Sequence, residues 1–307
     1  MTKKNFPPIL ITGAAGNVGR ELTKQLSARK VPFRTMIRST RDAQALSALE
    51  GAETVVGDFD KAETLAGALQ GVERAFLLTN SSDRAETQQS TFVEMARRAG
   101  TKRIVKLSQW AASSHSPVRF LRYHAAVERK IRESGMAYTF LRPNLFMQGL
   151  LAFRETIIGQ GKFFAAIGDA KVSVIDVRDI AAAAAAALTD QGHEGKTYNL
   201  TGPQALSHKD MAETLSGALG RVIEFVDLPP EAMREALIGA GLPVWQADGL
   251  IEDYAHYSRG EAAEVASGVQ EATGNPPRLF ADFASAYAEV FSASTAQKTL
   301  GAAVPSR

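Results

Sequence analysis

The 307-residue sequence contains no cysteine, and no apolar run in it reaches the roughly 20 residues that a membrane-spanning helix needs. The absence of cysteine excludes disulfides, thiolate metal ligands and cysteine nucleophiles, and it suits a reducing compartment. Residues 1–8 are polar and lack the apolar core of a signal peptide. We therefore expect the protein in the cytoplasm.

A strong excess of one charge is also missing, because the 35 basic residues are balanced by 33 acidic ones and both are spread along the chain. This balance gives no sign of a nucleic-acid footprint or of a patch for a membrane surface. The Gly-x-Ser-x-Gly turn of serine hydrolases is absent. No metal-ligand spacing connects the histidines His115, His193, His208 and His256.

What the first half does contain is a regular alternation of short apolar runs and amphipathic stretches. The runs predict strands at residues 9–12, 33–37, 53–56, 74–78, 103–107 and 138–141. The amphipathic stretches predict helices at residues 18–28, 42–49, 61–69, 85–99 and 118–134. Strands that alternate with helices in this way form a parallel sheet wrapped by helices. The predicted fold is therefore α/β, with a doubly wound Rossmann sheet.

The pattern loosens after residue 144. It predicts a helix over 149–158, an apolar run over 172–177, an alanine-rich helix over 179–188 and a strand over 197–200. We expect this last helix and strand to return to the main sheet, so that the Rossmann domain comprises residues 1–148 plus about 172–201. The remainder, about 149–171 plus 202–307, is expected to form a smaller α+β C-terminal domain that binds the substrate. Its predicted elements are helices over 209–219, 231–238 and 277–291 and a strand over 221–226.

The strongest motif is a glycine-rich turn, in which Gly13, Gly16 and Gly19 follow the first strand and open the first helix. In a dinucleotide-binding turn the first glycine permits a tight bend, and the second lets the backbone approach the pyrophosphate. The third lets helix and strand pack closely. The phosphates then lie at the positive end of the helix dipole. We assign the turn to the cofactor site together with its other members Ala15, Asn17 and Val18.

The end of the second predicted strand indicates which dinucleotide binds. NAD-binding units usually carry Asp or Glu there, bonded to the 2′-hydroxyl of the ribose. This chain has Arg38, Ser39 and Arg41, whose guanidinium and hydroxyl groups suit the 2′-phosphate of NADP(H). Asp42 is close, but it falls where the next helix begins and is better explained as an N-terminal cap. We therefore expect NADP(H) rather than NAD(H).

Four more residues follow the third and fourth strands, at the edge where such sheets bind ligands. Asp58, next to Phe59, is placed to accept a hydrogen bond from the adenine amino group. A cap for the helix from residue 61 explains Asp58 equally well. Thr79 and Asn80 end the fourth strand. We include all four in the predicted cofactor site.

Beyond these single motifs, the chain resembles a known family over nearly its whole length. The likeness rests on the glycine turn, on Arg38 and Gly57-Asp58, and on residues 124–128, 138–147 and 174–181. These segments resemble the NmrA-like family of atypical short-chain dehydrogenase/reductases. The family includes NADPH-dependent quinone, azo-dye and triphenylmethane-dye reductases, and also non-catalytic redox sensors that bind a dinucleotide and a regulatory partner.

The resemblance directs attention to the helix predicted over residues 118–134. Ordinary short-chain dehydrogenases carry Tyr-x-x-x-Lys here, and the lysine lowers the tyrosine pKa so that the phenol exchanges a proton with the substrate. This chain has Phe120 at the tyrosine position and His124 at the lysine position. Tyr123 has only Val127 four residues on, which cannot titrate. The usual acid is therefore missing, which counts against alcohol dehydrogenation and sugar epimerisation.

The family pattern suggests that His124 faces the nicotinamide ribose or the substrate, and that Glu128, on the same helix face, orients it. A simple helix-surface pair is the alternative. Ser108 ends the fifth strand and is placed either to hydrogen-bond the substrate or to satisfy a loop. Pro143 and Asn144 match the segment that passes the nicotinamide in relatives, and a rigid turn is the alternative.

Substrate recognition is expected from the loosely patterned second half. We assign four of its apolar and aromatic side chains to the substrate pocket, although each of them also suits a core position: Phe146, Met147, Phe164 and Trp245. A planar, electron-poor acceptor would stack on such side chains. Hydride transfer to a quinone or a dye needs little acid help from the protein.

The leading hypothesis is therefore an NADPH-dependent reductase that passes hydride to a flat, conjugated acceptor such as a quinone, a dye or an enone. The competing hypothesis is a sensor that binds NADP(H) without turnover and regulates a protein partner. An isomerase or epimerase is a third class, which Phe120 and His124 disfavour. The sequence shows no clear oligomer interface, so a homodimer stays open.

Overall fold

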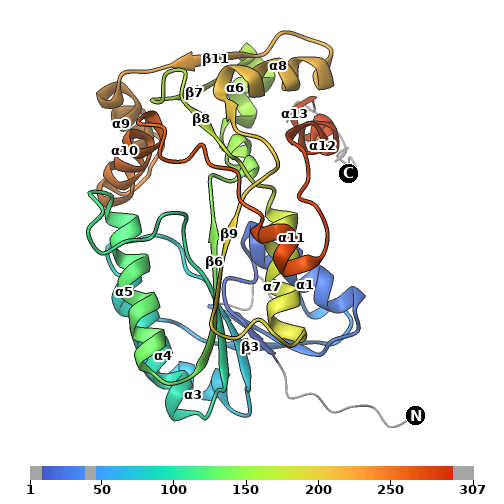
Figure 1. Ribbon diagram of the computed structural model, residues 1–307, viewed down its shortest axis with the longest axis vertical. Coiled ribbons are helices and arrows are strands. Elements are labelled where there is room, and N and C mark those ends of the chain that lie inside the picture. Colours follow the sequence, from blue (N-terminus) through green and yellow to red (C-terminus); the bar gives the residue numbers. More distant parts are fainter. Residues whose placement is uncertain (1–8, 39–45, 293–307) are drawn as a thin grey trace, which may run out of the picture.

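The computed structural model describes residues 9–38 and 46–292, and a seven-stranded parallel sheet lies at its centre (Figure 1). The strand order is β3-β2-β1-β4-β5-β6-β9, the order of a Rossmann sheet extended by one strand. This arrangement confirms the predicted fold class. The strands are β1 (Ile9–Ile11), β2 (Phe33–Ile37), β3 (Ala52–Val56), β4 (Arg74–Leu77), β5 (Arg103–Leu107), β6 (Ala137–Pro143) and β9 (Lys196–Leu200).

Helices cover both faces of the sheet, because its strands are apolar on both sides. On one face lie α1 (Asn17–Ala28), α7 (Val177–Thr189) and α11 (Gly268–Thr273). On the other lie α3 (Ala62–Leu69), α4 (Ala85–Arg98) and α5 (Arg119–Glu133). Along β1 the side chains alternate between the two cores, so Ile9 and Ile11 join the α1 side and Leu10 joins the α4 side.

A smaller unit lies beyond the carboxyl end of β6, in the upper part of Figure 1. It contains a parallel pair, β7 (Lys162–Ala165) with β11 (Glu224–Asp227), and an antiparallel pair, β8 (Lys171–Val172) with β10 (Leu206–Ser207). It has an apolar core of its own. Its helices are η2 (Met147–Phe153), α6 (Arg154–Gln160), α8 (His208–Leu219), α9 (Pro230–Gly239), α10 (Val244–Ser258), α12 (Phe280–Ala286) and α13 (Ala288–Ser292).

Several elements differ from those that the sequence predicts. The run over 172–177 adds no strand to the main sheet, since only Lys171–Val172 is a strand and it pairs with β10. The helix predicted over 277–291 is broken into α12 and α13. The helix predicted over 42–49 lies partly outside the described residues. The fifteen-residue helix α10 was not predicted at all.

Candidate cofactor and active site

The glycine turn forms an open cradle at the start of α1. Gly13 has a φ of +63°, which favours glycine, and its carbonyl oxygen accepts a hydrogen bond from the Gly16 backbone. A Cβ on Gly19 would lie 2.1 Å from the Gly13 carbonyl oxygen, so only glycine fits at Gly19. Gly16 and Asn17 are exposed, and the first turn of α1 carries no acidic residue. These features fit a pyrophosphate bound by backbone N–H groups at the helix N-terminus.

The adenosine end of the predicted site is described in part. Arg38 is exposed directly after β2, whereas Ser39 and Arg41 lie outside the described residues. Asp58 accepts a hydrogen bond from the Asp60 backbone at 3.0 Å, and α3 has Lys61 rather than Asp58 at its N-cap. The capping alternative for Asp58 is therefore wrong.

Other predicted cofactor residues end the strands of the same sheet edge. Phe59 is half-buried and its ring lies 5.6 Å from that of Phe92. Thr79 accepts a hydrogen bond from Gln89 Nε2 at 2.8 Å, and Asn80 is exposed. Val18 differs from the other residues of the turn, because its side chain is in the core below α1.

Pro143 ends β6 and the buried Asn144 follows it. The Asn144 amide nitrogen donates to Ser173 Oγ at 2.8 Å and to the Ala262 carbonyl oxygen at 2.9 Å, and its amide oxygen accepts from the Leu145 backbone. These bonds join β6 to the smaller unit. The amide group of Asn144 therefore forms its hydrogen bonds within the protein. The rigid-turn alternative describes Asn144 better than a cofactor contact does.

A buried polar cluster lies between β5, α4 and α5, and its centre is a lysine that the sequence analysis missed. Lys106 is 0% exposed, and burial lowers its pKa to about 7, partly opposed by the charge of Glu128. Its Nζ lies 2.9 Å from His124 Nδ1 and 2.9 Å from Gln89 Oε1. The signal was a lysine inside the otherwise apolar end of a predicted strand, which is rare without a partner.

Glu128 contacts a different set of groups from the one expected. Its Oε1 accepts from Ser108 Oγ at 2.6 Å, and its two oxygens accept from Arg142 at 2.9 and 2.6 Å. Burial opposes ionisation of Glu128, but the hydrogen bonds from Arg142 and Ser108 outweigh it and lower its pKa. The expectation that Glu128 orients His124 is wrong, because the hydrogen bond to His124 comes from Lys106.

Phe120, which is predicted to occupy the position of the usual tyrosine acid, makes apolar contacts. Phe120 packs against Gly249 of α10, where an added Cβ would lie 2.4 Å from the ring, and its ring centroid lies 5.4 Å from that of Trp245. Tyr123 forms a hydrogen bond with Ser81 Oγ at 2.8 Å, and burial raises its pKa well above the usual range. Neither side chain is suited to donate a proton near neutral pH.

Three of the four predicted substrate residues line one apolar pocket in the smaller unit. Phe146, Met147 and Phe164 border a cavity of about 50 Å³. Trp245 does not border it, because it packs on α5. The pocket also includes His208, whose pKa is lowered to about 4 by burial and whose Nδ1 has no hydrogen-bond partner in the described part of the chain. The other lining residues are Leu145, Gly149, Leu150, Phe153, Phe163, Val174, Met211 and Tyr254.

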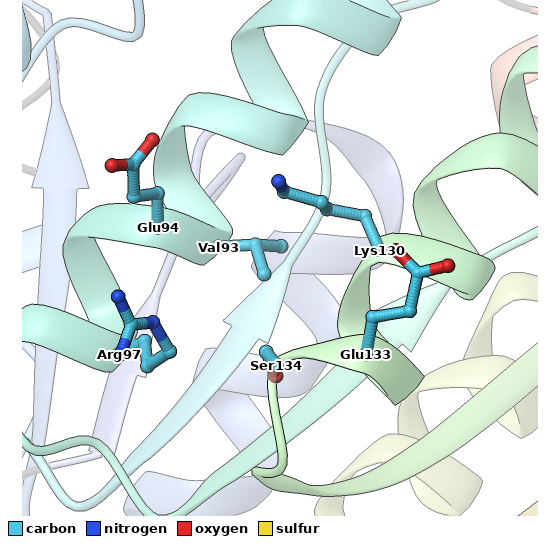
Figure 2. Close-up of a pocket in the computed structure, with 6 residues that line it drawn as sticks. All are labelled: Val93, Glu94, Arg97, Lys130, Glu133 and Ser134. Carbon is cyan, nitrogen blue, oxygen red and sulfur yellow. The ribbon is translucent and has the colours of Figure 1, made fainter.

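A second cavity, of about 320 Å³, lies between α4 and α5 (Figure 2). The residues that line it are Val93, Glu94, Arg97, Lys130, Glu133 and Ser134. Lys130 and Glu133 belong to the last turn of α5 and Ser134 follows it, whereas His124 lies in the first half of the helix. This charged cavity therefore lies nearer the C-terminal end of α5 than the Lys106–His124 pair does. We do not assign it to the cofactor or the substrate.

Within residues 9–38 and 46–292, no helix is both long and apolar enough to cross a membrane. The same residues contain no group of three or more His, Asp or Glu side chains arranged to hold a metal ion. The strand order and the glycine cradle together define a dinucleotide-binding protein of the Rossmann class.

Comparison with known proteins places it more narrowly. The model of the NmrA-like family matches residues 6–272, and the chain belongs to this family. It is 39% identical over 285 residues to an NAD(P)H azoreductase from Xenophilus azovorans, which covers 93% of this chain and 99% of that protein.

Two solved structures are similar over nearly their full length. The NADPH-dependent quinone oxidoreductase of Escherichia coli in complex with NADPH has a TM-score of 0.81 at 30% identity, covering 91% of this chain and 99% of that one. The triphenylmethane reductase of Citrobacter sp. in complex with NADP(H) has a TM-score of 0.78 at 29% identity, covering 91% and 99%.

Proposed function

We propose that the protein is an NADPH-dependent reductase that transfers hydride to a planar, conjugated acceptor, such as a quinone, an azo dye or an enone. One observation carries this proposal. The sheet edge combines an open dinucleotide cradle with a site in which Phe120 replaces the tyrosine acid. A conjugated acceptor disperses the charge that hydride brings, so it needs less acid help than a simple carbonyl.

When bound, NADPH supplies the hydride, and the chain's own residues bind and orient the reactants. The cradle from Gly13 to Gly19 would hold the pyrophosphate, and Arg38 would pair with the 2′-phosphate. Phe146, Met147 and Phe164 would provide apolar surface on the side of the acceptor. The reaction then depends mainly on positioning.

His124 and Ser108 are proposed to contact the nicotinamide ribose or the acceptor. His124 is 8% exposed, and its Nε2 has no hydrogen-bond partner among the described residues. Ser108 Oγ already donates to Glu128, which leaves its oxygen free to accept. Glu128 would act by holding Ser108 and Arg142 through hydrogen bonds, and not by orienting His124.

The relatives support a reductase rather than a sensor. The azoreductase, the quinone oxidoreductase and the triphenylmethane reductase are all named for the reduction of conjugated molecules. All three match nearly the whole chain, including the smaller unit that would bind the acceptor. The cytoplasmic location and a homodimer stay predictions.

A panel of acceptors tests the proposal. The purified protein is mixed with NADPH and with a quinone, an azo dye, a cationic triphenylmethane dye or an enone, and the absorbance of reduced nicotinamide is followed. We expect protein-dependent oxidation of NADPH with at least one acceptor, and slower oxidation of NADH. Tight binding of NADPH without turnover on any acceptor would contradict the reductase and favour the sensor.

A further inference from the structure

Lys106 is a buried lysine whose ammonium group is matched by three hydrogen-bond acceptors. Its Nζ lies 2.9 Å from Gln89 Oε1, 3.0 Å from the carbonyl oxygen of Leu107 and 2.9 Å from His124 Nδ1. A lysine ammonium has three N–H donors and no acceptor. The surroundings therefore use every donor that a protonated lysine offers. Gln89 is held in place by its own bond to Thr79.

This arrangement sets the tautomer of His124. Because the ammonium of Lys106 only donates, His124 Nδ1 must accept. A neutral imidazole that accepts at Nδ1 carries its proton at Nε2. The Nε2–H group has no hydrogen-bond partner among the described residues, and the ring is not wholly enclosed. His124 can therefore donate one hydrogen bond from Nε2, on the side of the ring opposite Lys106.

The charged groups around this pair come from α5 and β6. Burial lowers the pKa of Lys106 to about 7, and the charge of Glu128 partly opposes this. Burial, and then the positive charges of Lys106 and Arg142, hold the pKa of His124 well below its usual 6.5. The Tyr123 ring lies 4.2 Å from that of His124 and keeps its hydroxyl on Ser81. Below about pH 7 the exchangeable proton of the pair therefore resides on Lys106.

We propose that Lys106 is a positioning residue that holds His124 as an Nε2–H donor and replaces the proton that His124 gives to a reduced acceptor. This inference rests on the proposed function, since it concerns how the reduced acceptor is neutralised. It assigns to a lysine on β5 the proton supply that the missing tyrosine provides in ordinary short-chain dehydrogenases. His124 touches the acceptor, whereas Lys106 acts through His124.

The proton balance closes for a quinone. Its conversion to a hydroquinone takes one hydride, which NADPH supplies, and one proton. As the O–H bond forms on the acceptor, the Nε2–H bond of His124 breaks, and the Lys106 ammonium transfers a proton to Nδ1. Lys106 becomes a neutral amine and His124 stays neutral. A proton from water then binds at Nε2, and the Nδ1 proton returns to Lys106.

Two acceptors with different proton needs separate this role from simple support of the fold. A quinone needs hydride and a proton, whereas a cationic triphenylmethane dye becomes the neutral leuco form with hydride alone. We expect Lys106→Met to lower kcat/KM for the quinone about tenfold or more, without a parallel fall for the dye. The proposal would be overturned if kcat/KM fell equally for both acceptors, or if kcat/KM for the quinone did not fall.

A matched control is available four residues earlier. Lys102 pairs with Glu73 at the surface, and its side chain is 71% exposed. Lys102→Met makes the same chemical change away from the cluster, so quinone and dye reduction should both match the unsubstituted protein. If kcat/KM for the quinone fell as much in Lys102→Met as in Lys106→Met, the cause would be a general effect of charge, and the assignment would be overturned.

The pH dependence of the unsubstituted protein gives a test that needs no variant. The proton supply requires the ammonium form of Lys106, so quinone kcat/KM should be constant below about pH 7 and fall about tenfold per pH unit above it. Reduction of the cationic dye should not show this fall. The same descending limb with both acceptors would contradict a role in proton supply.

The hydrogen-bond arrangement can be tested without turnover, by nitrogen-15 NMR of the histidine rings with and without NADPH. We expect His124 as the Nε2-protonated tautomer, and in Lys106→Met a mixture of tautomers with a higher His124 pKa. The same tautomer and pKa in both proteins would overturn the proposal. If no acceptor is reduced but Lys106 controls the tautomer, the proposed function fails while the pairing stands, so the two failures are distinguishable.

Discussion

Gly16 and Gly19 lie one helical turn apart, yet they have different structural roles. A Cβ on Gly19 would overlap the Gly13 carbonyl oxygen at 2.1 Å, whereas a Cβ on Gly16 would meet only that oxygen at 3.4 Å and otherwise open space. Gly19 is therefore required by the packing of α1 on β1. A glycine at Gly16 would be needed only for a pyrophosphate to approach the exposed backbone, as the predicted cofactor site requires.

This difference predicts two distinct results. Gly16→Ala should keep the melting temperature of the ligand-free protein and weaken NADPH binding about tenfold or more, whereas Gly19→Ala should also lower the free energy of unfolding by about 1–3 kcal/mol. Calorimetry and NADPH titration measure both quantities. Unchanged NADPH affinity in Gly16→Ala would argue against this turn as the phosphate site.

Arg38 is predicted to determine which of the two nicotinamide dinucleotides binds. Its exposed side chain follows β2, on the sheet edge that would hold the ribose. Arg38→Ala would remove the predicted bidentate partner of the 2′-phosphate, so the dissociation constant should rise about tenfold or more for NADPH and change little for NADH. Equal weakening of both would contradict the assignment.

The buried carboxyl of Asp253 in α10 should make the free energy of unfolding depend on pH. Burial raises its pKa to about 7, while Gln109 and Tyr257 donate to one oxygen and the other lacks a hydrogen-bond partner in the described part of the chain. Between about pH 4 and pH 7 the folded protein therefore holds a proton that the unfolded chain has lost. Asp253 should therefore contribute stability that is lost as pH rises through this window.

Asp253→Asn, which keeps the shape without the titration, should remove this contribution from the dependence of stability on pH, and urea unfolding at several pH values measures the change. The linkage from a single shifted group amounts to at most a few kcal/mol. Asp83→Asn at an exposed position is the control and should keep the slope. An unaltered slope in Asp253→Asn would show that other groups cause the pH dependence.

At the scale of elements, α10 is held against α5 by a close contact and an ion pair. The Arg119 guanidinium and backbone N–H both donate to Glu252, with distances from 2.7 to 3.0 Å. Beside this pair the ring of Phe120 lies directly over Gly249. Phe120, the residue predicted to replace the tyrosine acid, thus joins α5 to α10 of the smaller unit.

The contact between Phe120 and Gly249 determines whether Gly249→Ala stabilises or destabilises the protein. An exposed Gly→Ala change within a helix usually stabilises by up to about 1 kcal/mol. Gly249→Ala should instead destabilise by about 1–3 kcal/mol, because its Cβ would lie 2.4 Å from the Phe120 ring. In a Phe120→Ala background the penalty should vanish. The same penalty in both backgrounds, measured by urea unfolding, would exclude this contact as its cause.

These elements also show how far a sequence can be interpreted. The main sheet was predictable because each strand and helix has its own local pattern and the connections follow a single handedness. Helix α10 was not, since it carries Asp248-Gly249 in its middle and depends on packing against α5. Lys106 and His124 are 18 residues apart, and no local spacing reveals that they are hydrogen-bonded.

At the scale of the whole molecule, two units meet at the carboxyl edge of the sheet. Besides the contact of α5 with α10, Gln109 donates to Asp253, Trp110 Nε1 donates to the Glu261 carbonyl oxygen, and Asn144 joins β6 to the loop before α11. These bonds place the aromatic pocket of the smaller unit beyond the strand ends that would hold the nicotinamide. The arrangement suits hydride transfer between two bound, flat partners.

The most direct measurement of this account is a single turnover of the protein loaded with NADPH deuterated at the transferring position of C4. The complex is mixed rapidly with a cationic triphenylmethane dye or a quinone, and nicotinamide oxidation is followed. We predict oxidation at the rate of acceptor reduction, a slower reaction for the deuterated form, and deuterium on the central carbon of any leuco dye formed. Tight binding of NADPH, with no oxidation of the bound NADPH by either acceptor, would contradict the account.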